Sequence, residues 1–209
     1  FIQDLNLTRH VLNRYAALIP VTLDTIYRDN ANLSFDLAGN RTGPGDFLPD
    51  QVSLKVKPGA YRLEVKALDR ARGRQGIYRQ QVMVPEFGPD TLRISGLELA
   101  WKVTRGAGDP RFTKGDLTVI PLASRTYAVG QNIFVYYEIY NLERTAFGQT
   151  HYKVEYTVRP RTGATLGNVI ARLIQTITGK KSEEIRVGYE QAGQAQSERT
   201  YVELEIPRR

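Results

Sequence analysis

Histidine is the side chain best suited to acid–base chemistry and zinc binding near neutral pH, and this sequence has two, His10 and His151. Neither belongs to a helical zinc-binding motif, and they lie far apart along the chain. The absence of cysteine excludes a thiolate metal site. A zinc site would need carboxylates around one isolated histidine, so we predict neither a metal centre nor a cofactor.

Two short polar motifs resemble ligand-binding loops only in part. Gly179-Lys180-Lys181-Ser182 matches the end of a phosphate loop, but the upstream glycine is missing and the expected helix precedes it. We assign its glycine to the C-cap of that helix, with the lysines at the negative end of the helix dipole. Asp29-Asn30-Ala31-Asn32 begins like a calcium loop, yet no glycine and distal glutamate follow in register, so we expect a turn.

Nucleophilic catalysis has equally little support in the sequence. No Gly-x-Ser-x-Gly elbow is present. A triad assembled from distant segments stays open, because its members need not be neighbours along the chain. We predict a non-catalytic protein and assign no catalytic residue.

One segment has the spacing of an amphipathic helix in a chain that otherwise alternates like β-strand. Apolar residues recur at intervals of three and four, which predicts a helix at about 166–178. The residues of this apolar stripe are Leu166, Val169, Ile170, Leu173, Ile174 and Ile177. The stripe either covers its own sheet or faces outward as a docking site for a partner.

The remaining elements are predicted as antiparallel strands separated by turns. Tyr61–Ala67 and Tyr152–Val158 alternate apolar and polar residues, as half-buried strands do. Further strands are expected at Asn32–Leu37, Val52–Val56, Ile77–Val84, Leu92–Val103, Leu117–Leu122, Ile133–Tyr140, Glu184–Glu190 and Thr200–Ile206. Because no helices alternate with these strands, the pattern predicts β-sandwiches.

The strand Ile133–Tyr140 differs from the others because both of its faces are apolar. Phe134, Tyr136 and Tyr140 lie on the second face. One interpretation is a central strand, covered there by the inserted helix or by the neighbouring domain. The other is an exposed aromatic surface for a protein partner or a sugar.

Two halves of the chain share short strings in the same order, which predicts a tandem pair of homologous domains at 1–88 and 89–209. The paired strings are Ile2–Leu7 with Ile94–Leu99, Ile19-Pro20 with Ile120-Pro121, Tyr27–Leu33 with Tyr127–Ile133, and Val82–Pro85 with Leu204–Pro207. Most of the extra length of the second copy falls between Arg159 and Glu183, so the helix is an insertion. Chance similarity of short β patterns is the alternative.

The formal charge of the chain is +7. Basic residues alternate with acidic ones, as in Arg62 and Lys66 around Glu64, which is typical of a solvated sheet face and argues against nucleic acid. We expect an acidic protein partner or an anionic membrane surface. No stretch reaches the roughly 20 apolar residues of a membrane span. Membrane association is therefore expected to be peripheral.

Several strand and turn strings together resemble the C-terminal β-sandwich region of bacterial GWxTD-domain-containing proteins. The strings are Pro58–Val65, Ser95–Ala100, Ser124–Tyr127, Val135–Leu142, Phe147–Thr150 and Val154–Thr157. The resemblance spans about Val52 to Ile206, but the naming motif is absent, since the only tryptophan, Trp101, lies in Ala-Trp-Lys-Val. This resemblance implies an exported envelope protein and assigns no functional residue.

The sequence thus predicts an all-β protein of two tandem immunoglobulin-like antiparallel β-sandwiches, the second with the inserted helix. We expect a peripheral, periplasmic or envelope accessory subunit that docks on a larger membrane-bound assembly, an energy-transducing complex such as a photosynthetic reaction centre being one example. The alternatives are a carbohydrate or cell-wall binding module and an accessory domain of a longer envelope enzyme. The chain starts at Phe1 without a leader, so we expect a processed protein or part of a longer one.

Overall fold

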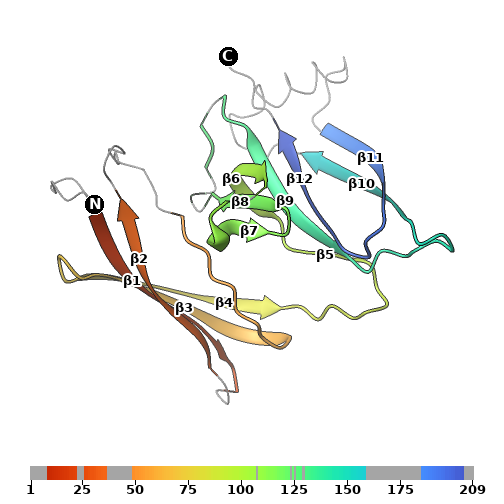
Figure 1. Cartoon of the computed structure of the whole chain (residues 1–209). Coiled ribbons are helices and arrows are strands. Elements are labelled where there is room, and N and C mark those ends of the chain that lie inside the picture. Colours follow the sequence, from red (N-terminus) through yellow and green to blue (C-terminus); the bar gives the residue numbers. More distant parts are fainter. Residues whose placement is uncertain are drawn as a thin grey trace. The chain divides into compact units, whose positions relative to one another are not determined.

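The computed structural model describes residues 9–22, 26–36, 49–106, 108–122, 124, 126–128, 130–158 and 185–204. Within these ranges the regular elements are antiparallel β-strands and one short 3-10 turn, η1 (Pro110–Phe112). The predicted all-β, antiparallel class is confirmed. The chain divides into two compact units, Phe1–Gly88 and Pro89–Arg209, which Figure 1 shows in red to yellow and in green to blue.

The first unit contains a four-stranded antiparallel sheet in the order β2-β1-β3-β4 (Figure 1). Its strands are β1 (Arg9–Pro20), β2 (Tyr27–Asp36), β3 (Gly59–Asp69) and β4 (Arg74–Val84). Asp69 Oδ1 accepts the backbone N–H groups of Ala71 and Arg72 at the β3–β4 turn. Gly73 completes this turn with a φ of 61°, a left-handed conformation that favours glycine.

Alternation along the strands gives this sheet two different faces. The pairing registers place one set of mostly aliphatic and aromatic residues together, which we call the apolar face: Ala16, Leu18, Tyr27, Leu33, Tyr61, Leu63, Val65, Tyr78 and Val82. The opposite, charged face includes Arg62, Glu64, Lys66 and Arg79. Ala16 and Ala17 are buried at the centre of the sheet, one on each face.

A strand-free segment, 50–57, contacts the apolar face at both of its ends. Arg14 forms an ion pair with Asp50 at 2.6 Å, and the Tyr61 hydroxyl donates a hydrogen bond to the carbonyl of Lys57. The prediction of a strand at Val52–Val56 is wrong, because this segment belongs to no sheet. Its alternating apolar residues are half-buried on one side without joining a ladder.

The second unit contains a larger sheet and a separate hairpin (Figure 1). The larger sheet has the strand order β12-β9-β6-β8-β7, and β5 also pairs with β9. Its strands are β5 (Arg93–Ile94), β6 (Glu98–Arg105), β7 (Thr113–Lys114), β8 (Leu117–Pro121), β9 (Ile133–Tyr140) and β12 (Glu198–Leu204). The hairpin pairs β10 (Thr150–Val158) with β11 (Ile185–Gly193). A register shift between Ala100 and Lys102 makes Trp101 an extra residue in β6, where it is 51% exposed.

Strand β9 has a hydrophobic cluster on each face. On one face, Tyr136 packs with core residues of β6 and β8: Ala100, Val103, Leu117 and Val119. On the other face, Tyr137 and Ile139 pack against Leu142 and Val154, the latter from the hairpin. β9 is therefore a central strand with a hydrophobic cluster on each face, and among the described residues the β10–β11 hairpin covers the Tyr137 face. Cover of the Tyr136 face by the inserted helix or by the neighbouring domain stays a prediction.

Other sequence-based predictions are corrected by the structure or concern residues outside its described part. The predicted strand Leu92–Val103 is split at residues 95–97 into β5 and β6. β1 pairs with β2, whereas β8 does not pair with β9, so the similarity between the two halves does not extend to strand order. The predicted helix at about 166–178 lies outside the described residues.

Candidate functional site

The sequence-predicted partner residues fall into two groups. Phe134, Tyr136 and Tyr140 lie on one face of β9. The other group, Leu166, Val169, Ile170, Leu173, Ile174 and Ile177, lies outside the described residues. The structure therefore locates only the aromatic group.

The predicted aromatic surface is not available as a stacking platform for a sugar. Tyr136 is 3% exposed, and Phe134 and Tyr140 are half-buried. Phe134 packs against Tyr201 with ring centroids 6.1 Å apart. The Lys114 ammonium lies 4.6 Å from the centroid of the Tyr136 ring, within the range of a cation–π contact. This finding corrects the proposed exposure, because neighbouring side chains of the same unit cover the central ring.

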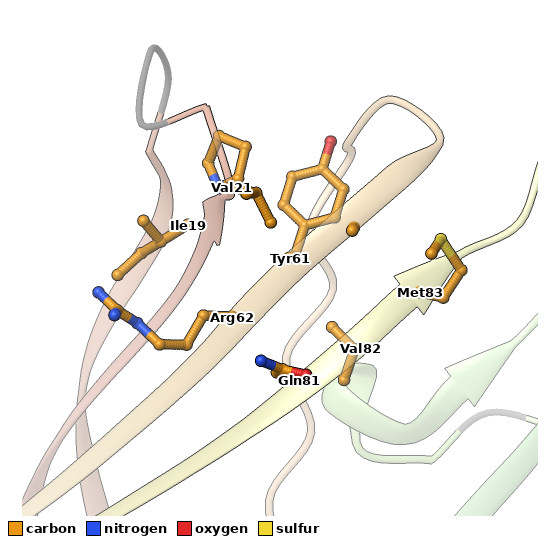
Figure 2. Close-up of a pocket in the computed structure, with 9 residues that line it drawn as sticks. Ile19, Val21, Tyr61, Arg62, Gln81, Val82 and Met83 are labelled. Atoms are coloured by element: carbon orange, nitrogen blue, oxygen red, sulfur yellow. The ribbon is translucent and has the colours of Figure 1, made fainter.

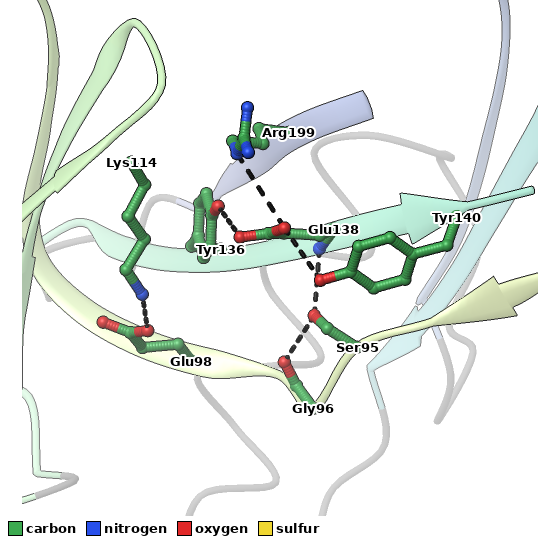
Figure 3. Close-up of polar contacts among 8 residues, drawn as sticks. All are labelled: Ser95, Gly96, Glu98, Lys114, Tyr136, Glu138, Tyr140 and Arg199. Atoms are coloured by element: carbon green, nitrogen blue, oxygen red, sulfur yellow. Dashed lines mark hydrogen bonds and ion pairs between the residues drawn. The ribbon is translucent and has the colours of Figure 1, made fainter. Parts of the chain in front are cut away.

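The hydroxyl groups of two of these aromatic residues converge on one carboxylate (Figure 3). Glu138 accepts hydrogen bonds from Tyr136 at 2.5 Å and from Tyr140 at 2.8 Å, one on each carboxylate oxygen. Arg199, opposite Glu138 on β12, places its Nε 3.8 Å from the same carboxylate. Alternation places the three β9 residues on one face, and the carboxylate satisfies both partly buried phenols.

Burial and the neighbouring carboxylate act on these tyrosines in the same direction. Burial raises the pKa of Tyr140 to about 12, and the hydrogen bond to Glu138 adds to this shift. The same two causes raise the pKa of Tyr136 even further. Both phenols therefore stay protonated near neutral pH and act as hydrogen-bond donors.

Ser95 joins this network to the segment between β5 and β6 (Figure 3). Its hydroxyl accepts the backbone N–H of Glu138 and donates to the carbonyl of Gly96, each at 2.9 Å. Its own N–H donates to the Glu138 carbonyl. The hydroxyl proton is thus engaged by a carbonyl, not a base, so the network is suited to holding strands together and not to nucleophilic chemistry.

The other polar residues singled out in the sequence are dispersed. His10 lies in β1 and His151 in β10, on different units. Asp29 lies inside β2, where its carboxylate pairs with Arg14 at 2.8 Å, so the predicted turn at Asp29–Asn32 is wrong. Gly179–Ser182 lies outside the described residues. No group of metal-ligating side chains occurs in the described part of the chain.

The first unit has an open groove at the end of its sheet (Figure 2). One wall is the cross-strand row Ile19, Arg62 and Gln81, and the other is the row Val21, Ala60 and Met83. The rows are two residues apart along the strands, or about 7 Å. We call this groove, which encloses about 550 Å³, the cross-strand trench.

The walls of the trench combine exposed aliphatic groups with one cation. Val21 is 76% exposed and Met83 is 71% exposed. The guanidinium of Arg62 forms no ion pair with any described residue. This combination suits an occupant that has an apolar side chain next to an anionic group.

The nearby charged residues are already paired with each other. Glu64, whose side chain is mostly buried, lies 2.6 Å from Arg79 and 3.0 Å from Lys66. The hydrogen bonds from Arg79 and then Lys66 lower the pKa of Glu64. Glu64 is therefore engaged by Arg79 and Lys66, and Arg62 faces solvent.

Sequence reasoning missed the trench because its walls are built from cross-strand neighbours. Ile19 and Gln81 are far apart along the chain and share a row only through the registers of β1, β3 and β4. The one local signal is the run Val82-Met83-Val84, in which apolar residues occupy both faces of a strand. Such a run predicts either a buried strand or an exposed apolar side chain.

Comparisons with protein-family models, with curated proteins and with solved structures give no match. In the described part of the chain, no helix has the length and apolar character needed to cross a membrane. The surfaces of the two units are therefore the features from which a function can be inferred.

Proposed function

We propose that this protein is a non-catalytic accessory subunit that binds another protein at a membrane surface. In this proposal it is exported to the periplasm or envelope of a bacterium and joins a larger membrane-bound assembly peripherally. A photosynthetic reaction centre is one example of such an assembly. The resemblance to the β-sandwich region of GWxTD-domain-containing proteins belongs to the same proposal.

The observation that carries the proposal is the exposure of large apolar side chains on both units. Phe147, in the loop before β10, is 91% exposed, and Met83 and Trp101 are also open to solvent. Single exposed apolar residues are common, but the trench adds a guanidinium that forms no ion pair with a described residue, and arginine is enriched at protein interfaces. The net charge of +7 favours association with an acidic partner or surface.

The proposal includes an immunoglobulin-like architecture for both units. In the second unit it is supported by the hairpin β10–β11, which packs over β9. In the first unit it is supported by segment 50–57, which contacts the apolar face of the sheet at both ends. Sandwiches of this kind serve many binding proteins, so the architecture is compatible with docking but does not specify it.

Site-specific photo-cross-linking in native membranes tests the proposal. The tagged full chain carries a photoreactive residue at Phe147, at Met83 or, as a matched exposed polar control, at Arg70. We expect the first two positions to cross-link to subunits of one membrane-bound complex and Arg70 to give only background. Equal yields at all three positions, or no adduct at any of them, would contradict the docking function.

Fractionation of cells of the source bacterium tests the location separately. We expect the protein in the membrane fraction, and we expect high salt to release it without detergent, because long-range attraction between charges is screened. Recovery with the cytoplasmic fraction would contradict the proposed export. Recovery that needs detergent would contradict peripheral attachment.

A further inference from the structure

In the described part of the chain, strand β4 is an edge of the first sheet. Among the described residues it pairs with β3 alone, in an unbroken register from Gly59 opposite Val84 to Asp69 opposite Arg74. Edge strands present a row of backbone N–H and C=O groups that another strand can pair with. Natural edges are usually blunted by short length, proline, bulges or charged side chains. β4 is eleven residues long, without proline or a register shift, and of these protections it has only the charges of Arg74 and Arg79.

The side chains of β4 are exposed on both faces of the sheet. Only Val82 and Val84 are partly buried. Tyr78, on the apolar face, and Ile77 and Met83, on the charged face, are among the exposed large apolar residues. An added strand would therefore cover apolar surface on both sides while pairing with the backbone.

The charge along this edge has one sign. β4 contains Arg74 and Arg79 and no carboxylate, although Arg79 is paired with Glu64 of β3. Arg62, one strand further in, lies in the same row as Gln81 and forms no ion pair with a described residue. A strand added beside β4 continues these rows at a spacing of about 4.8 Å per strand. A Glu or Asp facing the Gln81 row would then come within reach of Arg62.

We propose that β4 binds an extended, acidic segment of a partner protein as an additional strand of the first sheet. In this strand, apolar residues lie over Tyr78 and Val82 on the apolar face. An acidic residue lies on the charged face near Arg62, and an apolar residue enters the trench beside Met83. Backbone pairing supplies affinity, and the alternating side chains supply specificity. This inference depends on the proposed docking function and gives that function a site and a partner chemistry.

A second copy of this chain is a poorer match for the same edge. Antiparallel pairing of β4 with itself about its centre places Arg79 opposite Arg79, and like charges directly opposite each other are destabilising. In this register Gln75 lies opposite Met83 and Ile77 opposite Gln81, so no carboxylate comes near Arg62. Charge complementarity therefore favours a different, acidic chain.

Two capped synthetic peptides test the inference on the full chain. One alternates valine with glutamate and the other alternates valine with lysine. Binding is followed by fluorescence anisotropy of the labelled peptide and by backbone amide shifts of the isotope-labelled protein. We expect the glutamate peptide to bind at least about tenfold more tightly and to shift amides of β4. Equal binding of the two peptides, or shifts confined to other strands, would overturn the inference.

Exposed substitutions then assign the binding to the proposed residues. We expect Arg62→Gln and Met83→Ser each to weaken binding of the glutamate peptide by about threefold or more. Arg70→Gln is the matched control, because it removes the same charge from an exposed position of the β3–β4 turn. Equal weakening by Arg62→Gln and Arg70→Gln would show a net-charge effect and overturn the assigned site. Amide spectra of each variant establish that the fold is retained.

Sedimentation of the protein alone tests the self-pairing alternative. If the protein alone forms a dimer, and Met83→Ser or Gln80→Pro converts that dimer to a monomer, then the strand beside β4 is a second copy and the inference is overturned. The inference and the proposed function fail separately. Cross-links from Met83 to a membrane complex, combined with no peptide binding at β4, would leave the docking function standing and reject strand addition.

Discussion

The hydroxyl groups of Tyr137 and Tyr189 lie 2.7 Å apart and connect the large sheet of the second unit to the hairpin that covers it. Tyr137 comes from β9 and Tyr189 from β11, so the contact joins strands that share no backbone ladder. Burial and the shared hydrogen bond both raise the pKa of Tyr137. The pair is thus a side-chain link between the two layers.

We expect Tyr189→Phe to lower the free energy of unfolding by about 0.5–1.5 kcal/mol, because Tyr137 loses a hydrogen-bond partner in a partly buried position. Urea denaturation followed by circular dichroism measures the change. Tyr78→Phe is the control, since among the described residues its hydroxyl bonds to the exposed side chain of Gln80 alone. Equal effects of the two substitutions would show that the interlayer contact contributes no stability of its own.

Stability at alkaline pH depends on the protonated tyrosines around Glu138. The pKa of Tyr140 is about 12 in the folded chain against an ordinary value of 10.0. The folded state therefore binds this proton more tightly, so the stabilisation is complete below pH about 10 and is lost as pH rises through about 12. We expect the free energy of unfolding to fall across this interval and the fall to be shallower in Tyr140→Phe. An identical pH dependence in the variant would contradict the assignment.

The sequence predicts individual strands better than it predicts their partners. The predicted strand Ile133–Tyr140 coincides with β9. Its apolar residues occupy both faces, and both faces are covered. The Val52–Val56 pattern is equally regular, yet those residues lie outside every sheet. Side-chain alternation indicates that one side of a segment is buried. A strand also needs a backbone partner, and the identity of that partner cannot be predicted from the local sequence.

Leu117 tests the core of the second unit. It is 1% exposed and packs in the cluster around Tyr136. We expect Leu117→Ala to reduce the free energy of unfolding by about 2–5 kcal/mol through lost burial and a residual cavity. Leu97→Ala, at an exposed position between β5 and β6, should change it by less than about 0.5 kcal/mol. Chemical denaturation of both variants measures the difference, and similar values would contradict the assigned core.

A close approach between Gly108 and Thr118 makes another test possible. A Cβ at position 108 would lie 2.4 Å from Thr118 Oγ1 and 2.7 Å from its Cγ2, and Thr118 is buried. We expect Gly108→Ala to destabilise the protein by about 1–3 kcal/mol. Thermal unfolding of the variant, measured against Gly96→Ala, which has open space around it, gives this value.

The same steric argument predicts coupling between the two positions. Thr118→Ala removes both clashing atoms, so Gly108→Ala should cost less in that background than in the parent chain. A double-mutant cycle measures the coupling energy. Purely additive effects would mean that the backbone around residue 108 moves and Thr118 does not obstruct it.

The candidate docking site was less predictable than the fold. From the sequence, Tyr136 is either part of an exposed aromatic surface or covered on a central strand; the ring is buried, because residues of β6 and β8 surround it. Conversely, the sequence shows Arg62 only as one of several charged residues that alternate with apolar residues along a strand. Its isolation follows from the pairing of Glu64 with Arg79 and Lys66. Which charge stays unpaired depends on side-chain geometry and not on the pattern along the chain.

The extra residue in β6 gives the protein a built-in optical probe. Trp101 is the only tryptophan of the chain, and the register shift around it leaves the indole half in water. Its emission should therefore change little on unfolding, when a half-hydrated ring becomes a fully hydrated one. A partner that covers β6 would instead dehydrate the ring and shift the emission to the blue. Tryptophan fluorescence is thus a weak measure of folding in this protein and a sensitive measure of docking on its second unit.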